Sequence, residues 1–76
     1  MAVVRYLRRV TLERESTHTE ADSTYSIISD KGGQRWLQID TYGSQDRAIL
    51  GKKSQTVRFS PEAVLQLRRI LDDEGL

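Results

Sequence analysis

The sequence predicts an α+β fold, in which a curved antiparallel four-stranded sheet is followed by one C-terminal helix. Several short segments alternate apolar and polar residues with period two, as half-buried strands do, and the last segment changes to the period of an amphipathic helix. The chain has 76 residues, 37% of them hydrophobic, which suits one small domain. We therefore expect a single ββββα domain over residues 1–76, with strands at about 3–13, 24–29, 35–42 and 54–59 and a helix at about 61–73.

The first expected strand is unusually long. One parity of residues 3–13 is apolar apart from one cation: Val4, Tyr6, Arg8, Val10 and Leu12. Arg8 indicates either a bulge near Arg8-Arg9 or a cation on the apolar side, and the sequence leaves both open. The polar stretch 15–23 predicts a loop, in which we expect His18 to be a solvent-exposed residue without a metal or catalytic role.

The next two strands are expected to form a hairpin. Asp30-Lys31-Gly32-Gly33-Gln34 is a glycine-containing turn between two alternating segments, which predicts antiparallel neighbours. In 35–42, Leu37, Ile39 and Thr41 share one face, which we expect to pack against the helix. The opposite face carries aromatic and polar side chains: Trp36, Gln38, Asp40 and Tyr42.

The helix has a clear start. Ser60 suits the N-cap, Pro61 the first helical position, and Glu62 the first turn. The helix should end by Gly75. An apolar stripe, which we expect to pack on the sheet, consists of Ala63, Val64, Leu67, Ile70 and Leu71. Leu65 falls on the opposite side, and we expect it at or near a dimer interface.

Charge is strongly segmented although the total is only +1. Residues 31–58 hold six Lys and Arg against two Asp, which predicts a basic sheet, and the helical end is acidic. The chain has no cysteine, which removes thiolate-metal chemistry and fits a reducing cytoplasm. The apolar run at the start of the sequence is too short for a signal peptide or a membrane-spanning helix. No carboxylate pair, Ser-His-Asp set or metal-ligand spacing indicates catalysis, so we expect no enzyme, cofactor or metal.

Aromatic rings and cations are expected to share one face of the sheet, which predicts binding of single-stranded nucleic acid, because bases stack on rings while Lys and Arg neutralise phosphates. The candidate binding residues are Tyr25, Arg35, Trp36, Tyr42, Lys52, Lys53 and Arg58. Trp36 has a second interpretation as a lid over the hairpin. Asp40 opposes phosphate binding on this face unless a neighbouring cation pairs with it.

The strand alternation of 37–42, the Gly51-Lys52-Lys53 turn and the passage from Val57 through Ser60-Pro61-Glu62 into a helix resemble the positive cofactor four family of single-stranded DNA-binding transcriptional coactivators. The resemblance covers about 25–71 and points to a bacterial or phage relative. It implies a ββββα subunit, a homodimer joined through helices and sheet edges, and curved sheets that hold single-stranded DNA. Lys52 and Lys53 match the basic turn of the family, and Tyr42 matches its strand aromatic. Gly43 stands where the family has a tryptophan.

Two functions follow from these observations. The first is a dimeric single-stranded DNA-binding module in transcription or DNA metabolism, with DNA favoured over RNA and the transcription machinery as a possible partner. Such a protein is expected in the cytoplasm, associated with the nucleoid if it is bacterial. The alternative is a protein-interaction or accessory subunit of the same fold, of phage or mobile-element origin, whose basic residues are incidental.

Overall fold

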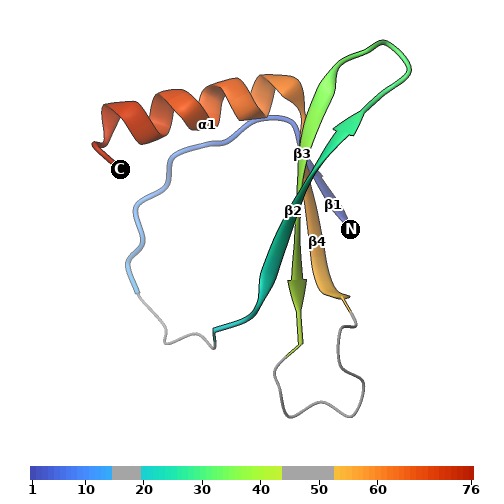
Figure 1. The fold of residues 1–76 in the computed structure, drawn as a ribbon. Coiled ribbons are helices and arrows are strands. Elements are labelled where there is room, and N and C mark those ends of the chain that lie inside the picture. Colours follow the sequence, from blue (N-terminus) through green and yellow to red (C-terminus); the bar gives the residue numbers. More distant parts are fainter. Residues whose placement is uncertain (15–19, 44–52) are drawn as a thin grey trace.

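The computed structural model describes residues 1–14, 20–43 and 53–76, which form one sheet and one helix (Figure 1). The elements are β1 (Ala2–Val4), β2 (Ser23–Ser29), β3 (Arg35–Tyr42), β4 (Lys53–Phe59) and α1 (Pro61–Asp73). The predicted α+β arrangement of four strands followed by a C-terminal helix is confirmed.

The sheet has the strand order β1-β4-β3-β2, so β1 and β2 are its two edges. β2 pairs with β3, and β3 with β4, in the expected antiparallel sense. β1 instead runs parallel to β4, with Ala2 opposite Val57 and Val4 opposite Phe59. The sheet is therefore mixed, and the expectation of a wholly antiparallel sheet is wrong for its first strand. A period-two pattern does not specify the direction of a partner that lies more than fifty residues away.

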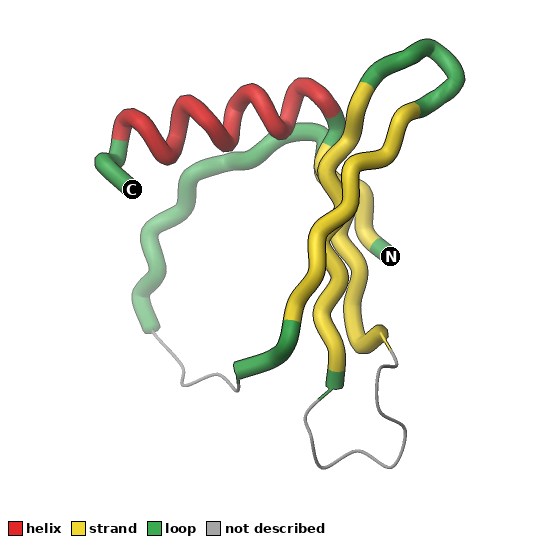
Figure 2. Tube along the Cα trace, viewed as in Figure 1, coloured by secondary structure: helices red, strands yellow, loops and turns green. Residues whose placement is uncertain are grey.

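The first strand is also much shorter than the predicted 3–13. After Val4 the chain leaves the sheet, and residues 5–14, which we call the arm, run beside α1 without a strand partner in the described part of the chain (Figure 2). Leu7 is bound at both backbone groups by one side chain. Its N–H donates to Gln66 Oε1 at 2.7 Å, and its carbonyl accepts from Gln66 Nε2 at 2.6 Å. Gln66 of α1 thus binds the backbone groups of Leu7 that we expected a neighbouring strand to bind.

Ser60 joins β1, β4 and the helix. Its Oγ accepts from the N–H of Ala63 at 3.2 Å, as an N-cap does, and its own N–H donates to the carbonyl of Val4 at 2.9 Å. Both Ser60 and Ala63 are completely buried. At the other end Gly75 has a φ of 70°, which a glycine adopts without strain, and the N–H of Leu76 donates to the carbonyl of Leu71 at 2.9 Å. The predicted helix start and end are both confirmed.

The helix projects away from the sheet instead of lying on it (Figure 1). Val64 lines a hollow with Leu37 and Ile27 of the sheet, whereas Ile70 lines another hollow with residues of the arm. The apolar stripe is thus divided between the sheet and the arm, which corrects the expectation that the whole stripe packs on the sheet.

A single copy buries very little apolar surface. Within the described residues, Ala63 is the sole fully buried apolar side chain. The radius of gyration is 14.8 Å, whereas a compact domain of this length has about 11 Å. The accessible surface of 6950 Å² exceeds by about 2,200 Å² the value of about 4,700 Å² expected for a compact chain of 8.7 kDa. Within the same described ranges, no helix is long and apolar enough to span a membrane.

Candidate nucleic-acid interface

Strand pairing sorts the side chains of the sheet onto two faces, because directly paired residues share a face. Tyr25 lies opposite Ile39, Ile27 opposite Leu37, and Ile39 also opposite Val57. The face that we call apolar includes Tyr25, Ile27, Arg35, Leu37, Ile39, Thr41, Val57 and Phe59. The face that we call polar includes Thr24, Ser26, Ile28, Trp36, Gln38, Asp40, Tyr42, Thr56 and Arg58.

The centre of the polar face is a hydrogen-bonded network across β3 and β4. Gln38 lies opposite Arg58, and Asp40 lies opposite Thr56. Arg58 donates from Nε at 3.0 Å, and also from Nη2, to Gln38 Oε1. Gln38 Nε2 donates to the two carboxylate oxygens of Asp40 at 3.3 and 3.1 Å, and the Thr56 hydroxyl donates to Asp40 at 2.6 Å. Each side chain therefore holds its neighbour in a fixed orientation.

This network removes the acidic group from the surface. Asp40 is 2% exposed and Gln38 8%, although no helix covers this face of the sheet (Figure 1). A buried carboxylate is stable only when donors surround it, and Gln38 and Thr56 supply them. An anionic ligand that approached this face would meet the Arg58 guanidinium before it met the Asp40 carboxylate. Arg58 uses two of its five N–H donors on Gln38, which leaves three.

Trp36 lies at one end of the polar face and is half-buried. Its Nε1–H donates to Asp30 Oδ2 at 2.9 Å, and the other oxygen of Asp30 accepts from the N–H groups of Gly32 and Gln34 at 2.9 and 3.0 Å. The Trp36 hydrogen bond, with smaller help from those two backbone groups, lowers the pKa of Asp30 below its usual 3.8. Arg5 places its guanidinium carbon 5.4 Å from the centre of the indole ring, within cation–π range.

Tyr42 lies at the other end of the polar face. A register shift between Thr41 and Tyr42 sets Thr41 opposite Gln55 but Tyr42 opposite Lys53. The hydroxyl of Tyr42 lies 3.0 Å from Thr24 Oγ1, which anchors the ring over β2. The bulge thus aims Tyr42 across the sheet, as bulges often do near functional sites.

The predicted binding residues therefore divide between the two faces. Trp36, Tyr42 and Arg58 share the polar face, and Lys53 begins β4 opposite Tyr42. Arg35 and Tyr25 belong to the other side, since Arg35 pairs with Ser29 on the parity of Leu37. The prediction for Lys52 lies outside the described residues. Leu65, expected near a dimer interface, is 49% exposed on α1.

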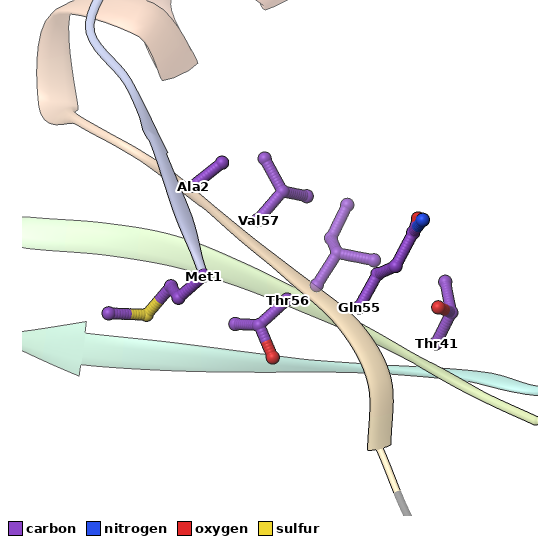
Figure 3. Close-up of a pocket in the computed structure, with 7 residues that line it drawn as sticks. Met1, Ala2, Thr41, Gln55, Thr56 and Val57 are labelled. Carbon is purple, nitrogen blue, oxygen red and sulfur yellow. The ribbon is translucent and has the colours of Figure 1, made fainter.

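The apolar face is open at several points. Tyr25 is 74% exposed and Ile27 48%. One hollow opens where this face meets β1 and β4 (Figure 3), and its lining residues are Met1, Ala2, Ile39, Thr41, Gln55, Thr56 and Val57. A second hollow lies between the sheet and the first turns of α1, lined by Ile27, Arg35, Trp36, Leu37, Val64 and Arg68.

Sequence reasoning missed the residues that surround Trp36. Arg5 was assigned to a long strand, and Asp30 only to the turn. Asp30 stands at the first position of a turn with Gly33 at φ 80°, where an Asp side chain often binds the backbone two residues on. That signal was available from Asp30-Lys31-Gly32-Gly33, whereas the contact of Arg5 depends on how the chain leaves β1. No protein-family model, curated protein or solved structure matches this chain.

Proposed function

We propose that this protein is a non-catalytic module that binds single-stranded DNA on the polar face of its sheet, and that it acts as a homodimer. The observation that carries the proposal is the position of Trp36 and Tyr42 at the two ends of one strand face, with Arg58 between them. Tyr42 follows Trp36 by six positions along β3, which corresponds to about 20 Å. Such spacing suits a flexible single strand that stacks separate bases on separate rings.

The electrostatics of the face support the same proposal. Asp40, whose charge would repel phosphate, is buried beneath Gln38 and Arg58. Arg58 keeps three N–H donors, and Arg5 lies over Trp36. A base that stacks on the indole displaces Arg5 from the ring and leaves its guanidinium beside the phosphate. Rings and cations then act on the same nucleotides, which is the combination that sequence-tolerant binding of a single strand requires.

A homodimer is supported by the exposed apolar surface. Apolar side chains such as Tyr25, Ile27 and Leu65 are exposed, and the excess of total accessible surface, about 2,200 Å² per chain, falls within the range of about 1,000–2,500 Å² that each copy buries in an obligate dimer. The apolar face and the polar face point in opposite directions. A dimer that covers the apolar faces therefore leaves both polar faces free for DNA.

The test is a titration of a fluorescent single-stranded DNA oligonucleotide, with the duplex and the matching RNA as competitors. Stacking on an aromatic ring is worth about 1–3 kcal/mol per base, so Trp36→Ala should weaken binding by roughly fivefold to more than a hundredfold. The slope of affinity against salt should stay nearly unchanged, because no cation is removed. Saturating DNA should also quench the Trp36 emission of the unaltered protein.

Trp36→Phe is the matched control, because it keeps a stacking ring but loses the N–H that donates to Asp30. If stacking matters, Trp36→Phe should bind far better than Trp36→Ala. Equal losses in the two variants would assign Trp36 a structural role through Asp30. Tighter binding of RNA would change the ligand from DNA to RNA, and unchanged affinity in Trp36→Ala would overturn the proposed face.

A further inference from the structure

The arm is strand-like in sequence but has no strand partner within the described chain. Leu7 is held by Gln66, and Arg9 forms an ion pair with Glu74. Gln66 and Glu74 are about 12 Å apart along a helix, while two residues of extended chain cover about 7 Å and the Arg9 side chain spans the rest. The arm must therefore be nearly extended where it follows α1.

The anchoring of Leu7 also fixes which backbone groups face outward. In an extended chain the N–H and C=O of one residue point to the same side, and the side alternates from residue to residue. Both backbone groups of Leu7 point to α1, so those of Arg8 and Val10 point away from it. The residues whose backbone groups point away from α1 are the even-numbered ones, and these include the exposed apolar residues of the arm. Tyr6 is 74% exposed, Val10 64% and Leu12 76%. An unpaired edge of this composition is a template for another strand.

The sheet offers a matching edge. β2 is an outer strand, with β3 on one side and no strand on the other among the described residues. It has seven residues, which part of the ten-residue arm can cover, and carries the exposed Tyr25 and Ile27 on its apolar face. The charges are complementary. Residues 1–14 hold four Arg against one Glu, whereas residues 20–30 hold Glu20, Asp22 and Asp30 and no cation.

The arm of one chain does not pair with the outer edge of its own β2, because it leaves from β1 at the opposite edge of the sheet and is held on α1 through Leu7 and Arg9. A second copy removes this obstacle. If two apolar faces meet around a two-fold axis parallel to the strands, the β1 edge of each copy lies beside the β2 edge of the other. Such an axis preserves chain direction. The arm first follows α1 and its last part then descends from the helix, whereas β2 rises toward the level of the helix (Figure 1), so this last part and β2 would pair antiparallel.

We propose that the second copy docks by strand addition: the arm of each chain pairs with the outer edge of β2 in the other. This inference rests on the homodimer of the proposed function and specifies how it forms. Each sheet then has five strands. Tyr6, Val10 and Leu12 extend the row of Tyr25 and Ile27 on the apolar face, and the two arms enclose the apolar space between the sheets. Exposed apolar residues of both segments become buried in the same step.

Because the chain has no cysteine, the junction can be tested by mixing two single-cysteine variants. Val10→Cys and Tyr25→Cys, on the same face of the proposed sheet, are combined, allowed to exchange subunits, and treated with a short bismaleimide. A covalent product of twice 8.7 kDa is expected from the mixture, at several times the yield from either variant alone. Val10→Cys mixed with Lys31→Cys, in the exposed turn beyond β2, should yield little product. A product formed equally well by Val10→Cys alone, or by Tyr25→Cys alone, would overturn the proposed pairing.

Proline substitutions test the backbone contact itself. Val10→Pro removes an outward N–H, and Thr11→Pro removes one that points to the helix side. Loss of one hydrogen bond at each of two junctions should raise the dimer dissociation constant by about fivefold to a hundredfold in Val10→Pro. Thr11→Pro should stay near the unaltered value. Equal effects of the two prolines would contradict the edge assignment.

These measurements separate the two proposals. A monomer by light scattering, or a dimer without mixed cross-links, overturns the strand addition even if single-stranded DNA still binds. A cross-linked dimer that fails to bind single-stranded DNA overturns the proposed function and leaves the strand addition standing.

Discussion

The two faces of this sheet invert the usual relation between polarity and burial. On the polar face, Gln38 and Asp40 are almost inaccessible, and they hydrogen-bond each other within β3 as well as Arg58 and Thr56 of the neighbouring β4. On the apolar face, Tyr25 and Ile27 are largely exposed. The polar face has hydrogen-bond partners for its buried side chains within a single copy. The other contains apolar groups that a single copy leaves in water.

This difference indicates that the two faces of the sheet have different roles. A satisfied polar network rigidifies a surface without needing a partner, which suits the presentation of rings and cations to a ligand. Exposed apolar residues gain free energy only when a further surface covers them. The polar face is thus the candidate for ligand binding, and the apolar face is the candidate for assembly. Substitutions on the two faces should have separable effects.

The largest effect is expected from a charge on the apolar face. Ile27→Asp places a carboxylate where the proposed dimer excludes water, and it also removes apolar burial. The two losses together should weaken the dimer by about 3 kcal/mol or more, which is over a hundredfold in its dissociation constant. Analytical ultracentrifugation over a range of protein concentrations measures this constant directly.

The matched control is Ser26→Asp, which introduces the same charge one residue earlier on the opposite face of β2. Its dimer should form nearly as well as that of the unaltered protein. If the two variants dissociate equally, the apolar face is not the assembly surface and the comparison between the faces fails.

A smaller effect is expected inside the polar network. Thr56→Val keeps the shape of the side chain but removes the hydroxyl that donates to Asp40 at 2.6 Å. A buried acceptor that loses a donor costs about 1–3 kcal/mol, so the free energy of unfolding in urea should fall by that amount. Thr56→Ser should recover most of the loss. The dimer dissociation constant should change little, and a large change would show that the polar face also takes part in assembly.

The parts of the fold that could be predicted are those with local signals. Asp30 to Gln34 contain the turn chemistry of the hairpin, and Ser60-Pro61 contain the start of the helix, so neither depends on distant residues. The alternation in 3–13 predicted one long strand, and the structure has a strand only at Ala2–Val4. The alternation could not show that Gln66, fifty-nine residues after Leu7, would take the place of a neighbouring strand.

The candidate site was only partly predictable for the same reason. The parity of 35–42 placed Trp36 and Tyr42 on one face, and pairing within the sheet agrees with that placement. Arg35 shares the parity of Leu37, so its separation from Trp36 could have been read from the sequence. The network of Gln38, Asp40, Thr56 and Arg58 depends on the pairing register of β3 with β4, which the residues of one strand alone do not determine.

The smallest expected effect concerns the hydrogen bond that holds the indole. The pKa of Asp30 is lowered, chiefly by the Trp36 N–H, so folding favours the ionised carboxylate. A depressed pKa gives a contribution to stability that is present above the usual value of 3.8 and is lost as the pH falls through the lower value of the folded state. The Trp36 emission should therefore stay constant on acidification to about pH 4 and change only below it.

In Asp30→Asn, whose amide oxygen can still accept from the indole, this titration should vanish. Far-ultraviolet circular dichroism over the same range checks that the chain remains folded. The pKa of Glu62 is also lowered, by its own backbone N–H and then by the Ser60 side chain. Glu62 is present in the unaltered protein and in Asp30→Asn, so its titration does not distinguish the two. Identical acid titrations of the two proteins would therefore show that Asp30 does not control the environment of Trp36, and that the indole is held by Arg5 or by packing alone.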